Sequence, residues 1–88
     1  MSYNIEFRPE AFKDLEGLDR VIAQRILDKL KWFVENFDSI APQALTGDLK
    51  GFYKLRVGDY RVIYSLKLSE ALITIHLIGH RKEVYHID

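Results

Sequence analysis

The 88-residue sequence contains no cysteine, two prolines and five glycines. Without cysteine there is no disulfide framework and no thiolate zinc site, so packing alone must hold the fold, which suits a reducing cytoplasm. No apolar run approaches the roughly 20 residues that span a bilayer. The opening stretch MSYNIEFRPE has neither the basic nor the apolar region of a signal peptide. We therefore expect a cytoplasmic protein that does not enter a membrane.

An excess of one charge sign is also absent, since 13 basic and 13 acidic residues give a formal net charge of zero. This balance alone does not favour nucleic-acid binding, although residues 45–88 carry seven basic and five acidic side chains. A neutral chain can still present a local basic cleft to an anion. The hydrophobic content of 48% and the charged content of 30% are typical of an ordered domain. The length predicts one domain over residues 1–88.

Hydrophobic periodicity predicts a strand, two helices and then three strands. The strand is expected near residues 3–7, and the helices near 9–18 and 20–37, with Asp19 as a cap for the second. Their apolar stripes contain Phe12, Leu15, Leu18, Ile22, Ile26, Leu27, Leu30, Phe33, Val34 and Phe37. After a polar connection at 38–51, strands are expected at 52–57, 60–67 and 72–79. We predict an α+β fold of order β-α-α-β-β-β, with a helical hairpin packed on one face of a small, mainly antiparallel sheet.

The stretch FYKLRVGDYRVIY, at residues 52–64, predicts a cationic patch on the other face of that sheet. Lys54 and Arg56 share a strand face, and a turn at Gly58-Asp59 places Arg56 opposite Arg61. Like charges opposite each other are destabilising, so an anion bound between them is one explanation. Guanidinium groups match phosphate oxygens well. The alternative is a solvated face, or pairing of these cations with Asp48, Asp59 or Glu83.

The C-terminal stretch GHRKEVYHID adds further cations beside an aromatic residue. Arg81 and Lys82 follow the last expected strand, and Tyr85 comes three residues later. Arg81 is expected to reach the patch, because this strand should neighbour residues 60–67. Cations beside an aromatic ring are typical of sites that hold single-stranded RNA.

The histidines and acidic residues offer weaker signals. His76 lies on a strand expected to be buried, which indicates a hydrogen-bonded core histidine. His80 precedes Arg81 and is a further titratable group near the patch. The acidic residues near the patch are isolated and lack metal-ligand spacing. We expect no metal and no cofactor.

The run LKGFYKLRVGDYRVIY, the order of elements and the tail GHRKEVY together resemble the RelE/ParE toxin superfamily, on its RelE-like branch. The resemblance implies the toxin of a type II toxin–antitoxin system, a ribosome-dependent endonuclease that cleaves messenger RNA in the A site and inhibits translation. The catalytic set of that branch falls on Lys54, Arg56, Arg61, Arg81 and Tyr85. Lys50, His80 and Lys82 are expected to bind the RNA. Arg56 stands where the best-known member has lysine, and a guanidinium does not readily lose a proton.

The implied reaction is attack of the RNA 2′-hydroxyl on the adjacent phosphorus without a metal. Arg56 and Arg61 would stabilise charge on the phosphoryl oxygens, and Lys54 is the first candidate for general base. Tyr85 would stack on or orient the nucleotide, and Arg81 would stabilise the leaving 5′-oxygen.

The resemblance also implies partners and leaves alternatives. The partners would be a RelB-like antitoxin and the ribosome with messenger RNA in its A site, with no membrane and no DNA except through the antitoxin complex. The main alternative is a ParE-like inhibitor of DNA gyrase without nuclease activity. A third is an inactive relative that only binds its antitoxin.

Overall fold

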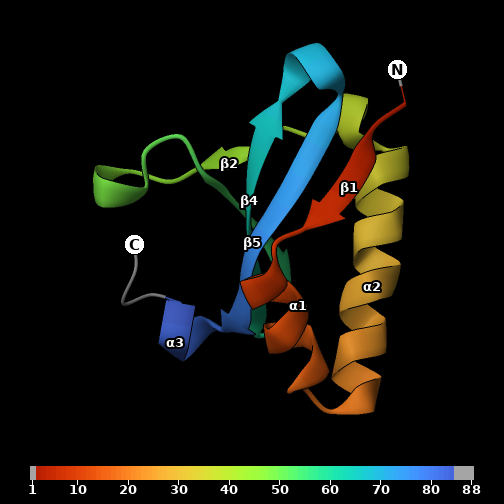
Figure 1. Cartoon of the computed structure of the whole chain (residues 1–88), viewed down its shortest axis with the longest axis vertical. Helices are drawn as coiled ribbons and strands as arrows, with labels where there is room; N and C mark the ends of the chain where they lie inside the picture. Colours follow the sequence, from red (N-terminus) through yellow and green to blue (C-terminus); the bar gives the residue numbers. More distant parts are fainter. Residues whose placement is uncertain (1, 85–88) are drawn as a thin grey trace.

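A computed structural model of the protein describes residues 2–84 and shows two layers, a hairpin of two helices on one side and a five-stranded sheet on the other (Figure 1). The sheet order is β1-β5-β4-β3-β2, with β1 parallel to β5 and the other neighbours antiparallel. These observations confirm the predicted α+β class. The strands are β1 (Asn4–Phe7), β2 (Gln43–Ala44), β3 (Tyr53–Val57), β4 (Tyr60–Lys67) and β5 (Leu72–His80). The helices are α1 (Pro9–Glu16), α2 (Arg20–Glu35) and α3 (Arg81–Val84), with 3₁₀ turns η1 (Phe37–Ser39), η2 (Gly47–Leu49) and η3 (Leu68–Glu70).

The main core lies between the α1–α2 hairpin and one face of the sheet, as predicted. Ile26, Leu30 and Phe33 of α2 are buried against Val62, Tyr64, Ile73, Ile75 and Ile78 of the two central strands. The helical stripes are narrower than predicted. Phe12 is 52% exposed, and its neighbour Ala11 is the buried residue of α1, while Leu27 is 38% exposed. Helix α2 ends at Glu35 rather than Phe37, which lies in the following 3₁₀ turn.

The opposite sheet face, which we call the outer face, carries a second and smaller apolar cluster. After α2 the chain crosses to this side through β2 and η2, drawn in green at the left of Figure 1. Leu45 and Ile63 are buried there, and Leu49, Phe52 and Leu77 pack against them. Strand β2, two residues paired with Lys54 and Tyr53 of β3, lies in the region predicted to be a connection.

Strand β5 carries one extra residue where it pairs with β4. Ile63 is opposite Leu77 and Tyr64 is opposite Ile75, so His76 has no partner in the ladder. Such a bulge changes the direction in which local side chains point, and here both His76 and Leu77 lie on the outer face, between the core residues Ile75 and Ile78. His76 was predicted to lie in the core.

The β3–β4 turn has the predicted form. Gly58 adopts a φ of 60°, which suits glycine at the first central position of a two-residue hairpin turn. Among residues 2–84, no helix is long and apolar enough to cross a membrane.

Candidate functional site

The hairpin β3–β4 brings two arginines face to face on the outer face. Arg56 is the cross-strand partner of Arg61, and Lys54 is the partner of Ile63. Both pairings agree with the register predicted from the turn. The neighbours of Lys54 and Arg56 along β3, namely Tyr53 and Leu55, pack against the main core, so alternation directs the two cations to the outer face. Arg56 is exposed and Lys54 is half-buried.

Arg61 is buried, with 2% of its surface exposed. Its Nη1 donates hydrogen bonds to the carbonyl oxygens of Gly58 at 3.1 Å and Tyr60 at 3.0 Å. On its other side Arg61 is the cross-strand partner of Gly79, which has no side chain to fill that position. Burial of a cation is costly unless hydrogen bonds accompany it. The guanidinium is thus fixed against the turn, a degree of burial that the sequence did not predict.

Arg81 begins α3 and is attached directly to the same turn. Its backbone N–H donates to the carbonyl oxygen of Asp59 at 2.8 Å, and α3 contacts both β4 and β5. The side chains of Arg81 and Lys82 are exposed. The backbones of Arg56, Arg61 and Arg81 therefore meet at the β3–β4 turn. Tyr85, the fifth predicted site residue, lies outside the described residues.

Two other predicted RNA-binding residues do not join these cations on the outer face. Lys50 is exposed at the end of η2, on the loop that covers the second cluster. His80 is paired with Tyr60 in the β4–β5 ladder, and their rings meet edge to face at 5.4 Å. Since Tyr60 packs against the main core, His80 lies on the helical side of the sheet, opposite to the side of Arg61.

The outer face also carries a serine–histidine pair that the sequence did not predict. His76 Nε2 lies 2.7 Å from Ser65 Oγ, and the His76 ring meets Phe52 edge to face at 5.0 Å. Burial lowers the pKa of the His76 imidazole, the charge of Arg8 lowers that pKa further, and Glu10 acts in the opposite direction. Alternation from Ile73 and Ile75, which pack in the main core, places this ring on the outer face, but its contact with Ser65 depends on the register of β4 and β5.

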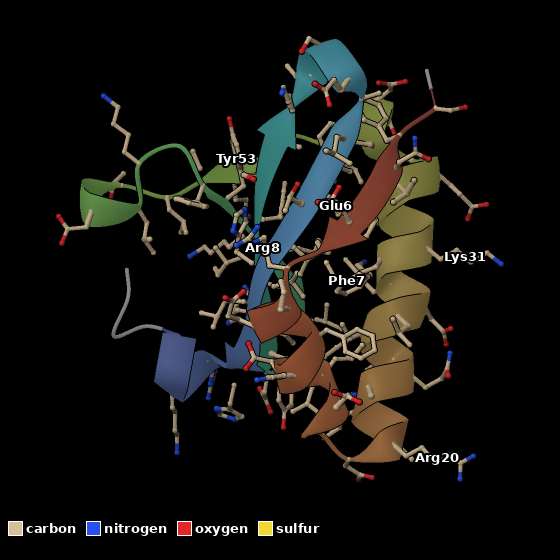
Figure 2. All side chains as sticks on the ribbon, viewed as in Figure 1. Glu6, Phe7, Arg8, Arg20, Lys31 and Tyr53 are labelled. Carbon is tan, nitrogen blue, oxygen red and sulfur yellow. The ribbon has the colours of Figure 1, made fainter. Side chains whose placement is uncertain are left out.

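Arg8 is a further cation beside this part of the outer face. Its backbone N–H donates to the Ile75 carbonyl oxygen at 2.9 Å, and its side chain forms a long ion pair with Glu10, at 4.0 Å. Figure 2 shows Arg8 on the side of the sheet away from α2, whereas Lys31 and Arg20 project into solvent from α2.

A cavity of about 240 Å³ adjoins the cationic strand at the sheet edge. The residues that line it come from α2 and the chain after it and from β3 and β4, and they include Trp32, Ile40, Pro42, Lys54, Leu55, Arg56 and Tyr64. Lys29 lies 4.1 Å from the centre of the Trp32 ring. Such a cavity combines apolar surface with positive charge and fits a partner that is both apolar and acidic. Among residues 2–84, no group of three or more acidic, histidine or cysteine side chains could hold a metal ion.

Comparison with known proteins shows which family this chain matches. Residues 5–85 match the family described as the ParE toxin of type II toxin-antitoxin system, parDE. A protein of Escherichia coli described as a RelE-like toxin is 31% identical over 91 residues, covering 99% of this chain and 94% of the other. Toxin RelE of Mycobacterium tuberculosis is 27% identical over 86 residues, covering 98% of this chain and 89% of its own.

Solved structures show the same fold. The RelBE2 toxin–antitoxin complex of Mycobacterium tuberculosis matches with a TM-score of 0.82 at 22% identity, over 92% of this chain and 100% of that chain. The isolated RelE toxin of Escherichia coli matches with a TM-score of 0.73 at 18% identity, over 99% and 100%. The chain belongs to the RelE/ParE superfamily of type II toxin–antitoxin toxins. Within that superfamily it falls in the RelE-like branch.

Proposed function

We propose that this toxin is a ribosome-dependent endoribonuclease that cleaves messenger RNA in the A site and so inhibits translation. The observation that supports the proposal most strongly is that one turn connects the backbone positions of Arg56, Arg61 and Arg81. Cations held in fixed positions stabilise the charge that gathers on phosphoryl oxygens in the transition state. A protein that acts on translating ribosomes would work in the cytoplasm.

The proposed reaction needs no metal. The 2′-oxygen attacks the adjacent phosphorus, its proton passes to the neutral amine form of Lys54, and the bond from phosphorus to the 5′-oxygen breaks. The products are a 2′,3′-cyclic phosphate and a 5′-hydroxyl, whose proton is supplied by a general acid. Arg56 contacts the phosphoryl oxygens, Arg81 stabilises the leaving 5′-oxygen, and Tyr85 orients the nucleotide. The side chains in this scheme are weak acid–base catalysts. Part of the catalysis therefore falls to the ribosome, which orients the message.

Arg61 has a different place in this scheme from the other arginines. Because its side chain is buried against the turn carbonyls, we assign it a positioning role. It holds the turn to which both Arg56 and Arg81 are attached, and it adds positive charge beneath the phosphate. The arrangement accounts for two arginines that face each other, a pairing that costs stability unless an anion lies nearby.

We also propose that a RelB-like antitoxin binds this toxin. A RelE–RelB complex of Pyrococcus horikoshii is similar, with a TM-score of 0.68 and 29% identity over 92% of this chain and 97% of that chain. The cavity between Trp32 and Lys54 offers an apolar wall and positive charge to an acidic segment. A disordered segment that orders on binding can cover both the cavity and the cationic end of the outer face.

The test is translation of a defined message in a reconstituted bacterial system, with cleavage ends mapped by primer extension. We expect cuts within codons that depend on ribosomes. The ParE-like alternative predicts intact message and inhibited supercoiling by purified DNA gyrase, so a gyrase assay is run on the same protein. Intact message with normal supercoiling would favour the inactive relative.

A further inference from the structure

We infer that Ser65, His76 and Phe52 form a nucleobase-binding subsite, which selects one base of the RNA strand held at the cationic end of the outer face. This inference rests on the proposed function and names a specificity determinant for it. The three residues come from three different segments, namely β4, β5 and the chain entering β3. All three are half-buried, so the group is neither enclosed in the core nor fully solvated.

The bulge in β5 lies at this group. Ile73 and Ile75 pack in the main core, so alternation directs His76 to the outer face, where its Nε2 lies 2.7 Å from Ser65 Oγ. The extra residue leaves Leu77 on the same face, so that Leu77 and not His76 is the partner of Ile63 in the ladder. Bulges of this kind are frequent beside active sites, where they redirect a side chain. A fold that only required packing could place an aliphatic residue here, because Ile63, Leu77 and Phe52 already form an apolar cluster.

The Ser65–His76 pair presents a defined pattern of hydrogen-bonding groups. When Ser65 donates to Nε2, the pair retains a donor at Nδ1 and acceptor lone pairs on Oγ. When Nε2 donates to Ser65 Oγ, the pair retains the Ser65 hydroxyl as a donor and Nδ1 of His76 as an acceptor. Either tautomer leaves one donor and one acceptor, which is the combination needed to read the edge of an unstacked base. Burial lowers the pKa of His76, which favours the neutral ring and therefore the acceptor.

The spacing along β4 fits a strand of RNA. Ser65 lies four residues beyond Arg61, on the same face of β4, which corresponds to about 13 Å along a strand. That span is compatible with one or two nucleotides between the cleaved phosphate and the base in the subsite. Phe52 offers an aromatic surface beside the pair, and aromatic side chains commonly accept unstacked bases. Arg8, whose charge acts on His76, is available to a phosphate next to that base.

The test compares cleavage maps over a message that contains every codon, in the reconstituted translation system. Ser65→Ala and His76→Gln should still cut, but the preference among the four bases at one codon position should fall about tenfold. Ser65→Thr keeps the hydroxyl and should retain the preference. Ser69→Ala, the same change as Ser65→Ala but in the exposed turn η3, serves as the matched control and should match the wild type. Identical maps for wild type, Ser65→Ala and His76→Gln would overturn the inference and leave the proposed function standing.

A second measurement does not depend on cleavage. NMR spectra of the His76 ring protons are recorded while pentanucleotides of a single base type, with 2′-deoxy substitution, are added in excess. We expect the His76 signals to shift with one base type more strongly than with the other three, and Ser65→Ala to reduce that difference. Equal shifts with all four, or none, would overturn the subsite. Failure of the wild type to cut any message would instead contradict the proposed function, while a base-selective NMR shift would still support the subsite.

Discussion

Arg61 of β4 lies directly opposite Gly79 of β5, so the buried cation rests against a residue that has no side chain. The arrangement leaves room for a guanidinium at a position where the strand pattern would otherwise place two side chains. Its Nη1 reaches the carbonyl oxygens of Gly58 and Tyr60, and the neighbouring Asp59 carbonyl oxygen accepts the Arg81 N–H. One turn therefore connects the positions of Arg56, Arg61 and Arg81.

Replacement of Arg61 should destabilise the fold as well as impair cleavage. Arg61→Gln leaves two partly buried carbonyl oxygens without their donor, which costs about 1–3 kcal/mol of unfolding free energy. Arg56→Gln changes an exposed side chain and should stay within about 0.5 kcal/mol of the wild type. Urea denaturation measures both values. Equal stability for the two variants would refute the structural role of Arg61.

Arg81→Ala should abolish most cleavage and leave the fold intact. The hydrogen bond to the Asp59 carbonyl oxygen uses the backbone N–H, which alanine retains, while the lost guanidinium should cost about 10²–10³-fold in rate. Arg20→Ala, on the far side of α2 (Figure 2), is the matched control and should cut normally. The measurement is the single-turnover cleavage rate on programmed ribosomes, with thermal unfolding as the check on folding. An undiminished rate for Arg81→Ala would remove this residue from the site.

His76 should make stability depend on pH in the acid range. Because burial lowers its pKa in the fold, the native state favours the neutral ring. This contribution is fully present above the unfolded pKa of about 6.5 and is lost as the pH falls through the folded value. Between pH 8 and pH 5, the unfolding free energy measured with urea should therefore fall more for the wild type than for His76→Gln. Equal losses of unfolding free energy in the two proteins would contradict the half-buried position of the His76 ring.

Tyr64 should ionise only at very high pH. Burial, with a smaller contribution from Tyr53, raises the pKa of Tyr64 from 10.0 to about 12. The fold favours the neutral phenol, so its contribution to stability is present below the unfolded pKa and is lost as the pH rises from about 10 to about 12. The difference between absorbance titrations of wild type and Tyr64→Phe isolates this residue. A phenolate that forms near pH 10 while the protein remains folded would contradict its burial.

The sequence predicted those features that depend on local alternation and periodicity. The Arg56–Arg61 and Lys54–Ile63 pairings followed from a two-residue turn at Gly58-Asp59, and the α2 core residues followed from helical spacing. Strand β2 was missed because a pair of residues carries no alternation to detect. Phe12 was placed in the core, yet Ala11 occupies that position because α1 packs closely on β5.

The remaining errors at the site arise from tertiary structure. His76 was predicted to lie in the core because β5 is apolar on both faces, yet it lies on the outer face next to Leu77, at a register shift that is invisible until the strands are paired. His80 shares a strand with the site but faces the helices, beside Tyr60. The burial of Arg61 depends on Gly79, 18 positions away in sequence and adjacent only across the sheet.

The most direct test of the account is the chemistry of the ends produced on a purified ribosome with a defined codon in its A site. The account predicts a 2′,3′-cyclic phosphate and a 5′-hydroxyl, and no cut when the nucleotide before the cleaved bond lacks its 2′-hydroxyl. A 5′-phosphate with a 3′-hydroxyl, or cleavage of the 2′-deoxy message at the same rate, would contradict attack by the 2′-oxygen and with it the role given to the cationic end of the outer face.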